Sequence, residues 1–128
     1  MIVLDTSLLI DGLTGLKRSG AAIRGSLAEG ERILLPALVL YEWLRGPRLA
    51  EELAAQEALF PARSAIPFGP EEAILSADLY RAVGRPRSRG VDLAIAACAI
   101  VREAPLWTLN HAGFRDVPGL RLYGANQR

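Results

Sequence analysis

The sequence predicts an α/β fold, a three-layer α/β/α sandwich built around a central, mostly parallel sheet of four to five strands. Short apolar runs of strand length recur along the 128 residues, and longer segments with helical periodicity separate them. Strands that alternate with helices form parallel βαβ units, whose crossover helices cover both faces of the sheet. About half of the residues (51%) are apolar, which is enough for one buried core. Residues 1–128 are therefore expected to form a single domain.

The first half of the chain is expected to supply two strands and three helical segments. Pro36 suits the first turn of a helix, where its missing N–H is not needed. Gly46-Pro47 ends that helix. In order, the predicted elements are a strand over Ile2–Leu4, helical material from Ser7 to about Leu27 that is broken around Gly12 to Gly20, a strand over Arg32–Leu35, and helices over Ala37–Arg45 and Arg48–Phe60.

The second half is expected to supply three short strands and two helices. Two acids, Glu71 and Glu72, fall in the first turn of one helix, where the helix dipole favours negative charge. In order, the predicted elements are a short strand over Ser64–Phe68, a helix that opens at Gly69-Pro70 and runs to Val83, a helix over Asp92–Glu103, a strand over Leu106–Leu109 and a last strand over Leu120–Tyr123.

Composition excludes some classes of protein but does not identify a partner. The longest unbroken apolar run, Leu93 to Val101, is far too short to cross a bilayer. No basic segment precedes the apolar N-terminus, so no secretory signal is predicted and the cytoplasm is the expected compartment. The lone cysteine, Cys98, lies inside the apolar run and is expected to be a core residue. The net charge of +1 is nearly neutral and indicates no particular ligand.

Three carboxylates fall where a parallel sheet places its functional sites. Such sheets bind ligands outside the carboxyl ends of their strands, and Asp5 directly follows the first strand while Asp92 opens a late helix. Glu42 lies among large apolar residues in the helix after the second strand, where a carboxylate is costly to desolvate unless another group compensates it. Each acid has a plain structural alternative. Asp5 and Asp92 could cap helices, and Glu42 could pair with Arg45 one turn later.

Three acids from distant segments that meet at one sheet edge form a constellation that helix caps alone do not explain. Their hard oxygen atoms suit Mg²⁺, and Mn²⁺ could substitute for it. A cation held in this way can activate water and neutralise a phosphate. The chain has one histidine and one cysteine, so a zinc site is disfavoured. The acids therefore indicate a divalent-cation site that acts on phosphate.

Four motifs carry a resemblance to a known family. In order, they are the opening Ile2-Val3-Leu4-Asp5-Thr6-Ser7, the helix from Pro36 to Glu42, the Gly84-Arg85 turn that leads to Asp92 and Ile95-Ala96-Ala97, and the closing Thr108-Leu109-Asn110 with Phe114 and Pro118-Gly119-Leu120. Each is weak alone, but their order and spacing along nearly the whole chain are specific. Together they resemble the PIN-domain family, in particular the VapC toxins of bacterial and archaeal toxin–antitoxin pairs.

The resemblance implies roles for the acids and for three hydroxyl groups beside them. Thr6 or Ser7 would orient the first acid, and a threonine would support the site from the end of a later strand. The implied residues are the catalytic metal ligands Asp5, Glu42 and Asp92, with supporting side chains on Thr6, Ser7 and Thr108.

The segment after the last full strand departs from the family pattern, which often has a fourth acid there. Asn110 is the best match to a polar residue lining the site, and Asp116 could replace it if its turn folds inward. With one carboxylate fewer, we expect one tightly held Mg²⁺ and a second ion recruited by RNA. The only histidine, His111, is expected to be a surface residue or an RNA contact rather than a general acid or base.

The activity that the resemblance implies is that of an endoribonuclease, which hydrolyses RNA to leave a 5′-phosphate and a 3′-hydroxyl. Arg85, Arg87 and Arg89 lie in the loop before Asp92, where they could hold the RNA backbone or could simply be solvated. The implied partners are RNA, a small VapB-like antitoxin and a second copy of the chain, with no membrane. The predicted helical segments over 7–27 and 37–60 could form the apolar groove for the antitoxin.

Two rival functions follow from the same residues. An Asp after the first strand is also the nucleophile of haloacid-dehalogenase-like phosphatases, which need a second acid two residues later and a downstream lysine. Here that position is Ser7, and the only lysine, Lys17, comes too early in the chain. The stronger rival is a PIN-like module that binds RNA or protein without cutting, which the incomplete acidic set allows.

Overall fold

Three short parallel strands lie at the centre of the protein, whose computed structural model describes residues 1–124. The strand order is β2-β1-β3, so that β1 (Ile2–Leu4) pairs with β2 (Ile33–Leu34) on one side and with β3 (Leu106–Trp107) on the other. All three residues of β1 are buried, as expected for a central strand covered on both faces. The carboxyl ends of the strands therefore meet at one edge of a rigid sheet.

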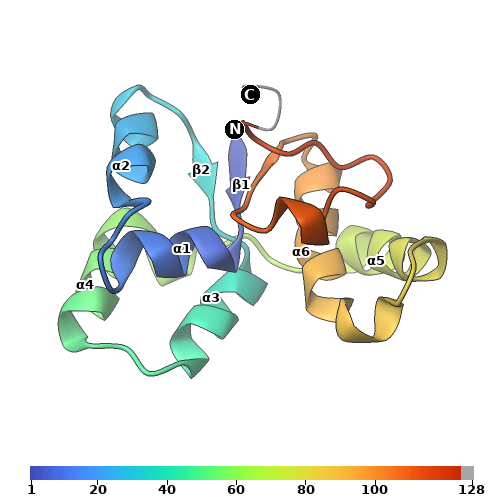
Figure 1. Ribbon diagram of the computed structural model, residues 1–128, viewed down its shortest axis with the longest axis horizontal. Helices are drawn as coiled ribbons and strands as arrows, with labels where there is room; N and C mark the ends of the chain where they lie inside the picture. The colour runs from blue at the N-terminus through green and yellow to red at the C-terminus, as the bar shows by residue number, and fades with distance from the viewer. Residues whose placement is uncertain (125–128) are drawn as a thin grey trace.

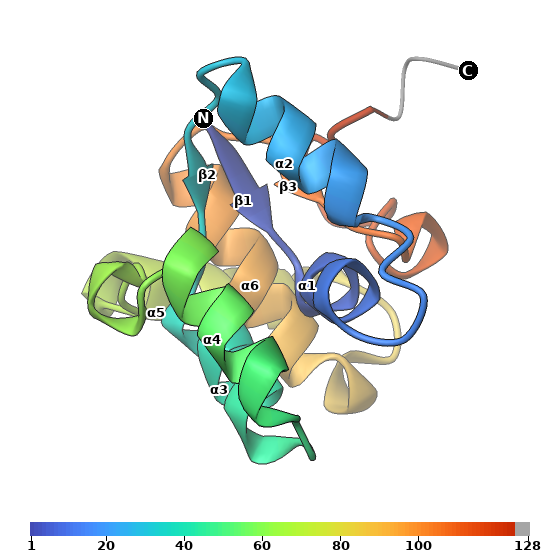
Figure 2. The same ribbon diagram turned by 90° about the vertical axis from the view of Figure 1, so that its left-hand side faces the viewer.

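The helices lie on both sides of the sheet, as the sandwich prediction requires (Figure 1). The first four are on one side and the last two on the other, and Figure 2, viewed from the first side, shows α4 in front of β1 and α6 behind it. The α-helices are α1 (Thr6–Leu13), α2 (Gly20–Ala28), α3 (Ala37–Arg45), α4 (Ala50–Leu59), α5 (Pro70–Ala82) and α6 (Gly90–Val101). Three 3₁₀ turns accompany them: η1 (Ala62–Ser64), η2 (Pro86–Ser88) and η3 (His111–Gly113).

The fold class is confirmed, but the prediction of four to five strands is wrong within residues 1–124. The segments predicted as strands over Ser64–Phe68 and Leu120–Tyr123 each form only one isolated parallel bridge, at Ile66 and at Leu122. Ile66 exchanges hydrogen bonds with the chain at the end of β2, but Pro67 follows it and has no N–H to extend a ladder. Both segments continue the sheet at its edges without becoming strands.

The helix boundaries differ slightly from the predicted ones and place Asp92 inside α6. The helical material predicted from Ser7 to Leu27 is two helices, separated between residues 13 and 20, inside the predicted break. The last helix begins at Gly90, two residues before the predicted start at Asp92. Asp92 therefore lies within the first turn of α6 and is not its cap.

Helix α6 forms the core of the sandwich. Its residues from Leu93 to Ala99 are all buried, and several are alanines, which let α5 and β1 approach closely. Cys98 is fully buried in this helix, and burial raises the pKa of its thiol to about 11. The burial of Cys98 confirms the prediction of a core residue, and its thiol is protonated at neutral pH. No helix within residues 1–124 has the length and apolar content that crossing a membrane requires.

A buried ion pair joins the start of α5 to the end of α6. Glu72 is 5% exposed and accepts hydrogen bonds from Arg102 Nη1 (2.7 Å) and from the Gly69 N–H (3.0 Å). Burial acts to raise the pKa of Glu72, but the hydrogen bonds outweigh it and the pKa lies below its ordinary value of 4.5. The ionised pair therefore stabilises the folded state above that value.

Glu72→Gln is expected to lower the free energy of unfolding at neutral pH by about 1–3 kcal/mol, because Arg102 loses its charged partner. The stabilisation by Glu72 should disappear as the pH falls below 4.5 and through the folded pKa, so wild type and variant should converge in acid. Urea unfolding at several pH values measures both effects. Glu71→Gln, an exposed acid in the same helical turn, is the matched control and should behave like the wild type. A constant difference at all pH values would contradict the role of the charge.

Candidate metal centre

Asp5 lies at the carboxyl end of β1, and its backbone continues the sheet because its N–H donates to the Trp107 carbonyl (2.9 Å). Its side chain is 5% exposed, and its Oδ2 accepts hydrogen bonds from Ser7 Oγ (2.9 Å) and Thr108 Oγ1 (2.7 Å). Asp5 occupies the N-cap position of α1, but its side chain makes no capping hydrogen bond. The helix-cap alternative therefore does not account for this carboxylate.

Thr108 connects Asp5 to the loop after β3. Its side chain is 2% exposed, and its hydroxyl oxygen also accepts a hydrogen bond from the Asn110 N–H (2.9 Å). Ser7 makes a parallel connection, because its oxygen accepts from the Leu109 N–H (3.0 Å). Two hydroxyls from opposite ends of the sequence thus hold one carboxylate in a fixed orientation.

Glu42 projects from α3 toward the start of α1. The hydroxyl of Thr6 donates to Glu42 Oε1 at 2.5 Å, so Thr6 orients this acid. Of the two candidates for orienting Asp5, it is Ser7 that bonds to that carboxylate. The alternative partner, Arg45, reaches Glu42 Oε2 only at 3.5 Å, and its side chain is 55% exposed. Such an exposed pair contributes little. Arg45 therefore leaves much of the Glu42 charge uncompensated.

The negative charges of both other acids act on Asp92. Burial, followed by the negative charges of Asp5 and Glu42, raises the pKa of Asp92, and the positive charge of Arg89 offsets part of this increase. Asp5, after β1, and Glu42, in α3, therefore lie close enough to Asp92, in the first turn of α6, for their charges to act on it. Within residues 1–124, however, no three acidic, histidine or cysteine side chains lie together as a ready-made set of metal ligands. The carboxylates repel one another and do not close around a single point.

Asn110 lies in the loop next to this cluster. Its Oδ1 accepts a hydrogen bond from the Gly113 N–H (3.1 Å) and so caps the η3 turn. A carbonyl oxygen has a second lone pair, which leaves Asn110 able to contact water or a cation as well. Its role as a ligand remains a prediction.

Asp116 has a partner of its own. Both of its carboxylate oxygens accept hydrogen bonds from the Arg89 guanidinium, at 2.6 and 2.9 Å, and these hydrogen bonds lower the pKa of Asp116. This pairing disfavours the alternative in which Asp116 completes the metal site. It also occupies Arg89, whereas Arg85 and Arg87 are exposed on the same loop. Contact of these two with RNA remains a prediction.

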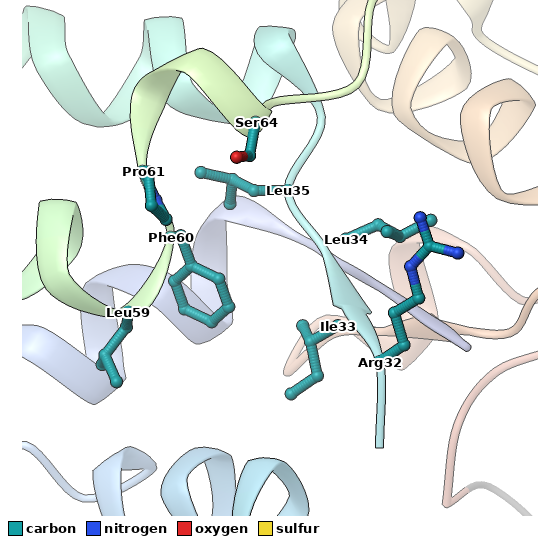
Figure 3. Close-up of a pocket in the computed structure, with 8 residues that line it drawn as sticks. All are labelled: Arg32, Ile33, Leu34, Leu35, Leu59, Phe60, Pro61 and Ser64. Carbon is teal, nitrogen blue, oxygen red and sulfur yellow. The ribbon is translucent and has the colours of Figure 1, made fainter. Parts of the chain in front are cut away.

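A separate pocket of about 220 Å³ lies beside the outer edge of β2 (Figure 3). Ile33 of β2 lies on the side of Phe60, which follows α4, whereas Leu34 lies on the side of Arg32. The pocket is lined by Arg32, Ile33, Leu34, Leu35, Leu59, Phe60, Pro61 and Ser64. None of these is acidic, so this pocket does not offer the carboxylate chemistry of the cluster.

Comparison with known proteins identifies the family of this chain. A family model described as PIN domain matches residues 2–120. The chain belongs to the PIN-domain family. A relative at the sequence level is Ribonuclease VapC19 of Mycobacterium tuberculosis, 34% identical over 130 residues, which cover 94% of this chain and 98% of that protein. The three carboxylates described above thus lie in a PIN-domain chain that has a named ribonuclease among its relatives.

Solved structures share the PIN fold with this chain. VapBC2 from Rickettsia felis, bound to a DNA fragment from its promoter, matches with a TM-score of 0.72 and 22% identity, over 95% of this chain and 97% of that chain. FitAcB from Neisseria gonorrhoeae matches with a TM-score of 0.69 and 20% identity, over 95% and 96% of the two chains. At these identities the structures establish the fold alone.

Sequence reasoning did not identify two features of the site. The first is the division of hydroxyl groups, in which Thr108 and Ser7 hold Asp5 while Thr6 holds Glu42. The second is the pairing of Arg89 with Asp116, 27 residues later in the chain. Two loop residues of opposite charge carry no periodic signal, so nothing in the sequence pointed to this contact.

Proposed function

We propose that the protein is a divalent-metal-dependent endoribonuclease and the toxin of a VapBC-type toxin–antitoxin pair. The observation that carries this proposal is the action of the Asp5 and Glu42 charges on Asp92, with hydroxyl groups that orient Asp5 and Glu42 at the carboxyl edge of the sheet. The sequence similarity to a named ribonuclease over nearly the whole chain supports RNA as the substrate.

The donor set fits Mg²⁺ or Mn²⁺, because the negative charges of Asp5 and Glu42 both act on Asp92, and carboxylate oxygens are hard ligands that suit such a cation. Asp5, Glu42 and Asp92 would hold it, with Asn110 beside them. When bound, the cation would supply positive charge and Lewis acidity next to the scissile phosphate. Ser7 and Thr108 hold the Asp5 carboxylate in place, and Thr6 does the same for Glu42, so these two ligands are oriented before RNA arrives.

An RNA-cleavage assay with controlled metal content tests the function. The protein freed of metal with a chelator should be inactive, and Mg²⁺ or Mn²⁺ should restore cleavage that leaves 5′-phosphate ends. Asp5→Asn, purified in parallel, measures any contaminating nuclease. Cleavage that persists in the chelator and in Asp5→Asn would contradict the proposal. RNA binding without cleavage under all metal conditions would favour the alternative of a non-cutting PIN-like binding module.

We also propose a VapB-like antitoxin as a partner, since solved proteins of the same fold are named as VapBC complexes. Large apolar side chains are exposed along the junction of α3 and α4. Those most exposed are Tyr41 (57%), Leu44 (50%), Leu49 (60%) and Leu53 (37%). A solvated apolar strip of this kind is typical of an interaction surface. A homodimer, a single domain over residues 1–128 and a cytoplasmic location complete the proposal.

Leu44→Asp and Leu53→Asp are each expected to weaken antitoxin binding at least about 10-fold, because each places a charge in an apolar interface. Co-purification with the antitoxin encoded beside the toxin gene, followed by calorimetry, measures the loss. Ile74→Asp is the matched control, because Ile74 is 67% exposed on α5, on the opposite side of the sheet. Equal binding by all variants would contradict the assignment of this surface.

A further inference from the structure

Arg89 is the most extensively bonded arginine near the site. Its guanidinium donates to both oxygens of Asp116 and to the carbonyls of Gly84 (3.0 Å) and Gly113 (3.0 Å). Only 15% of its side chain is exposed, compared with 55–77% for arginines that make single surface pairs, such as Arg45, Arg81 and Arg18. Both terminal nitrogens of this guanidinium already donate hydrogen bonds within the protein, which leaves little of it to bind an RNA phosphate.

The Gly113 contact connects Arg89 to Asp5 through an unbroken series of hydrogen bonds. Arg89 donates to the Gly113 carbonyl, and the Gly113 N–H donates to Asn110 Oδ1. The Asn110 N–H donates to Thr108 Oγ1, which in turn donates to Asp5 Oδ2. Arg89 thus anchors the outer end of the loop whose inner end orients Asp5.

Arg89 also acts on Asp92. It is the last residue before α6, and its carbonyl accepts the hydrogen bond from Leu93 N–H (2.8 Å) that opens this helix. Because its side chain is bonded to Gly113 and Asp116, Arg89 connects the first turn of α6, which carries Asp92, to the loop that orients Asp5.

We propose that Arg89 and Asp116 form a positioning pair that holds the Asn110 loop and the start of α6 in the arrangement in which the acids bind a divalent cation. This inference rests on the proposed function and deepens it. It also revises the role of Arg89, which positions metal ligands and does not hold RNA, and leaves Arg85 and Arg87 as the residues of that loop available to RNA.

The test compares Arg89→Gln, Arg89→Lys, Asp116→Asn and the double variant Arg89→Gln/Asp116→Asn with the wild type. Calorimetry with Mn²⁺ alone measures metal affinity, steady-state cleavage of one RNA gives kcat and KM, and thermal unfolding shows that each variant is folded. Arg81→Gln is the matched control, because it breaks an Arg–Asp pair on the surface of α5.

Loss of a side chain that orients metal ligands costs about 10–100-fold in affinity or activity. Arg89→Gln and Asp116→Asn should each weaken Mn²⁺ binding and lower kcat by about 10-fold or more, while KM for RNA changes by less than about two-fold. The double variant should lose no more Mn²⁺ affinity or kcat than the more impaired single variant, because both changes remove the same contact. Arg89→Lys keeps the charge without the fork and should fall between the wild type and Arg89→Gln. Arg81→Gln should match the wild type.

A rise in KM for Arg89→Gln with unchanged Mn²⁺ affinity would overturn the inference and assign Arg89 to RNA. Unchanged metal affinity and kcat in every folded variant would also overturn it, while wild-type activity would leave the proposed function intact. A wild type that neither binds Mn²⁺ nor cleaves RNA would overturn the proposed function itself. If Arg89→Gln does not fold, Asp116→Asn and Arg89→Lys carry the same comparison.

Discussion

Asp92→Asn is expected to abolish RNA cleavage and, at the same time, to stabilise the metal-free protein at neutral pH. Burial and the negative charges of Asp5 and Glu42 raise the folded pKa of Asp92 above its ordinary value of 3.8. Ionised Asp92 therefore destabilises the folded state, and this cost develops as the pH rises above that value and is complete above the folded pKa. Asparagine has nearly the same shape and removes the charge. Activity should fall by at least about 100-fold, because a ligand of the cation is lost.

Thermal unfolding in chelator at neutral pH, and again near pH 4, measures the effect on stability. The advantage of Asp92→Asn should be present at neutral pH and shrink in acid, where wild-type Asp92 binds a proton. Asp78→Asn, which removes an exposed acid of α5, should change neither activity nor stability appreciably. A variant that is less stable than the wild type at neutral pH and still cleaves RNA would contradict the convergence of the three acids.

Thr108→Val is expected to lower kcat by about 10–100-fold and to reduce the free energy of unfolding by about 1–3 kcal/mol. The threonine hydroxyl donates to Asp5 and accepts from the Asn110 N–H at a position that is 2% exposed. Valine fills the same space but leaves both partners without this hydrogen bond. Asp5 can then rotate away from the position in which it would bind the cation.

Thr108→Ser separates the hydroxyl from the methyl group and should keep most of the activity. The control is Thr14→Val, since the hydroxyl of Thr14 donates only to the Ile10 carbonyl within α1 in the described structure. The Thr14→Val variant should lose some stability, but its folded fraction should cleave RNA as fast as the wild type. Steady-state kinetics and urea unfolding of all three proteins decide the matter. If Thr108→Ser is as impaired as Thr108→Val, packing and not the hydrogen bond determines the effect.

Much of the site could be predicted because its acids are placed by local rules. Asp5 follows a fully apolar strand, Glu42 interrupts an apolar helical face, and each position relative to the sheet follows from the βαβ order. The approach of the three acids was predicted from that order and is supported by the pKa of Asp92. The ends of strands and helices were less predictable, because Ile66 and Leu122 read as strands yet pair at one residue only.

The loops around the site could not be predicted, since their contacts join residues far apart in the chain. The hydrogen bond from Thr108 to Asp5 spans 103 residues, and that from Arg89 to Asp116 spans 27. Arg85, Arg87 and Arg89 look alike in the sequence, but only burial and partners distinguish Arg89 from the other two. Their different roles depend on the folded loop and not on residue type.

The tight turn at Gly113 limits how this site can change in evolution. A Cβ atom at position 113 would overlap the side chain of Asn110, whose oxygen binds the backbone of the same turn. Any acid introduced there by a single substitution would have to displace the Asn110 side chain and break its hydrogen bond with the Gly113 N–H. A fourth carboxylate at position 113 would therefore come at the expense of the Asn110 amide that caps this turn.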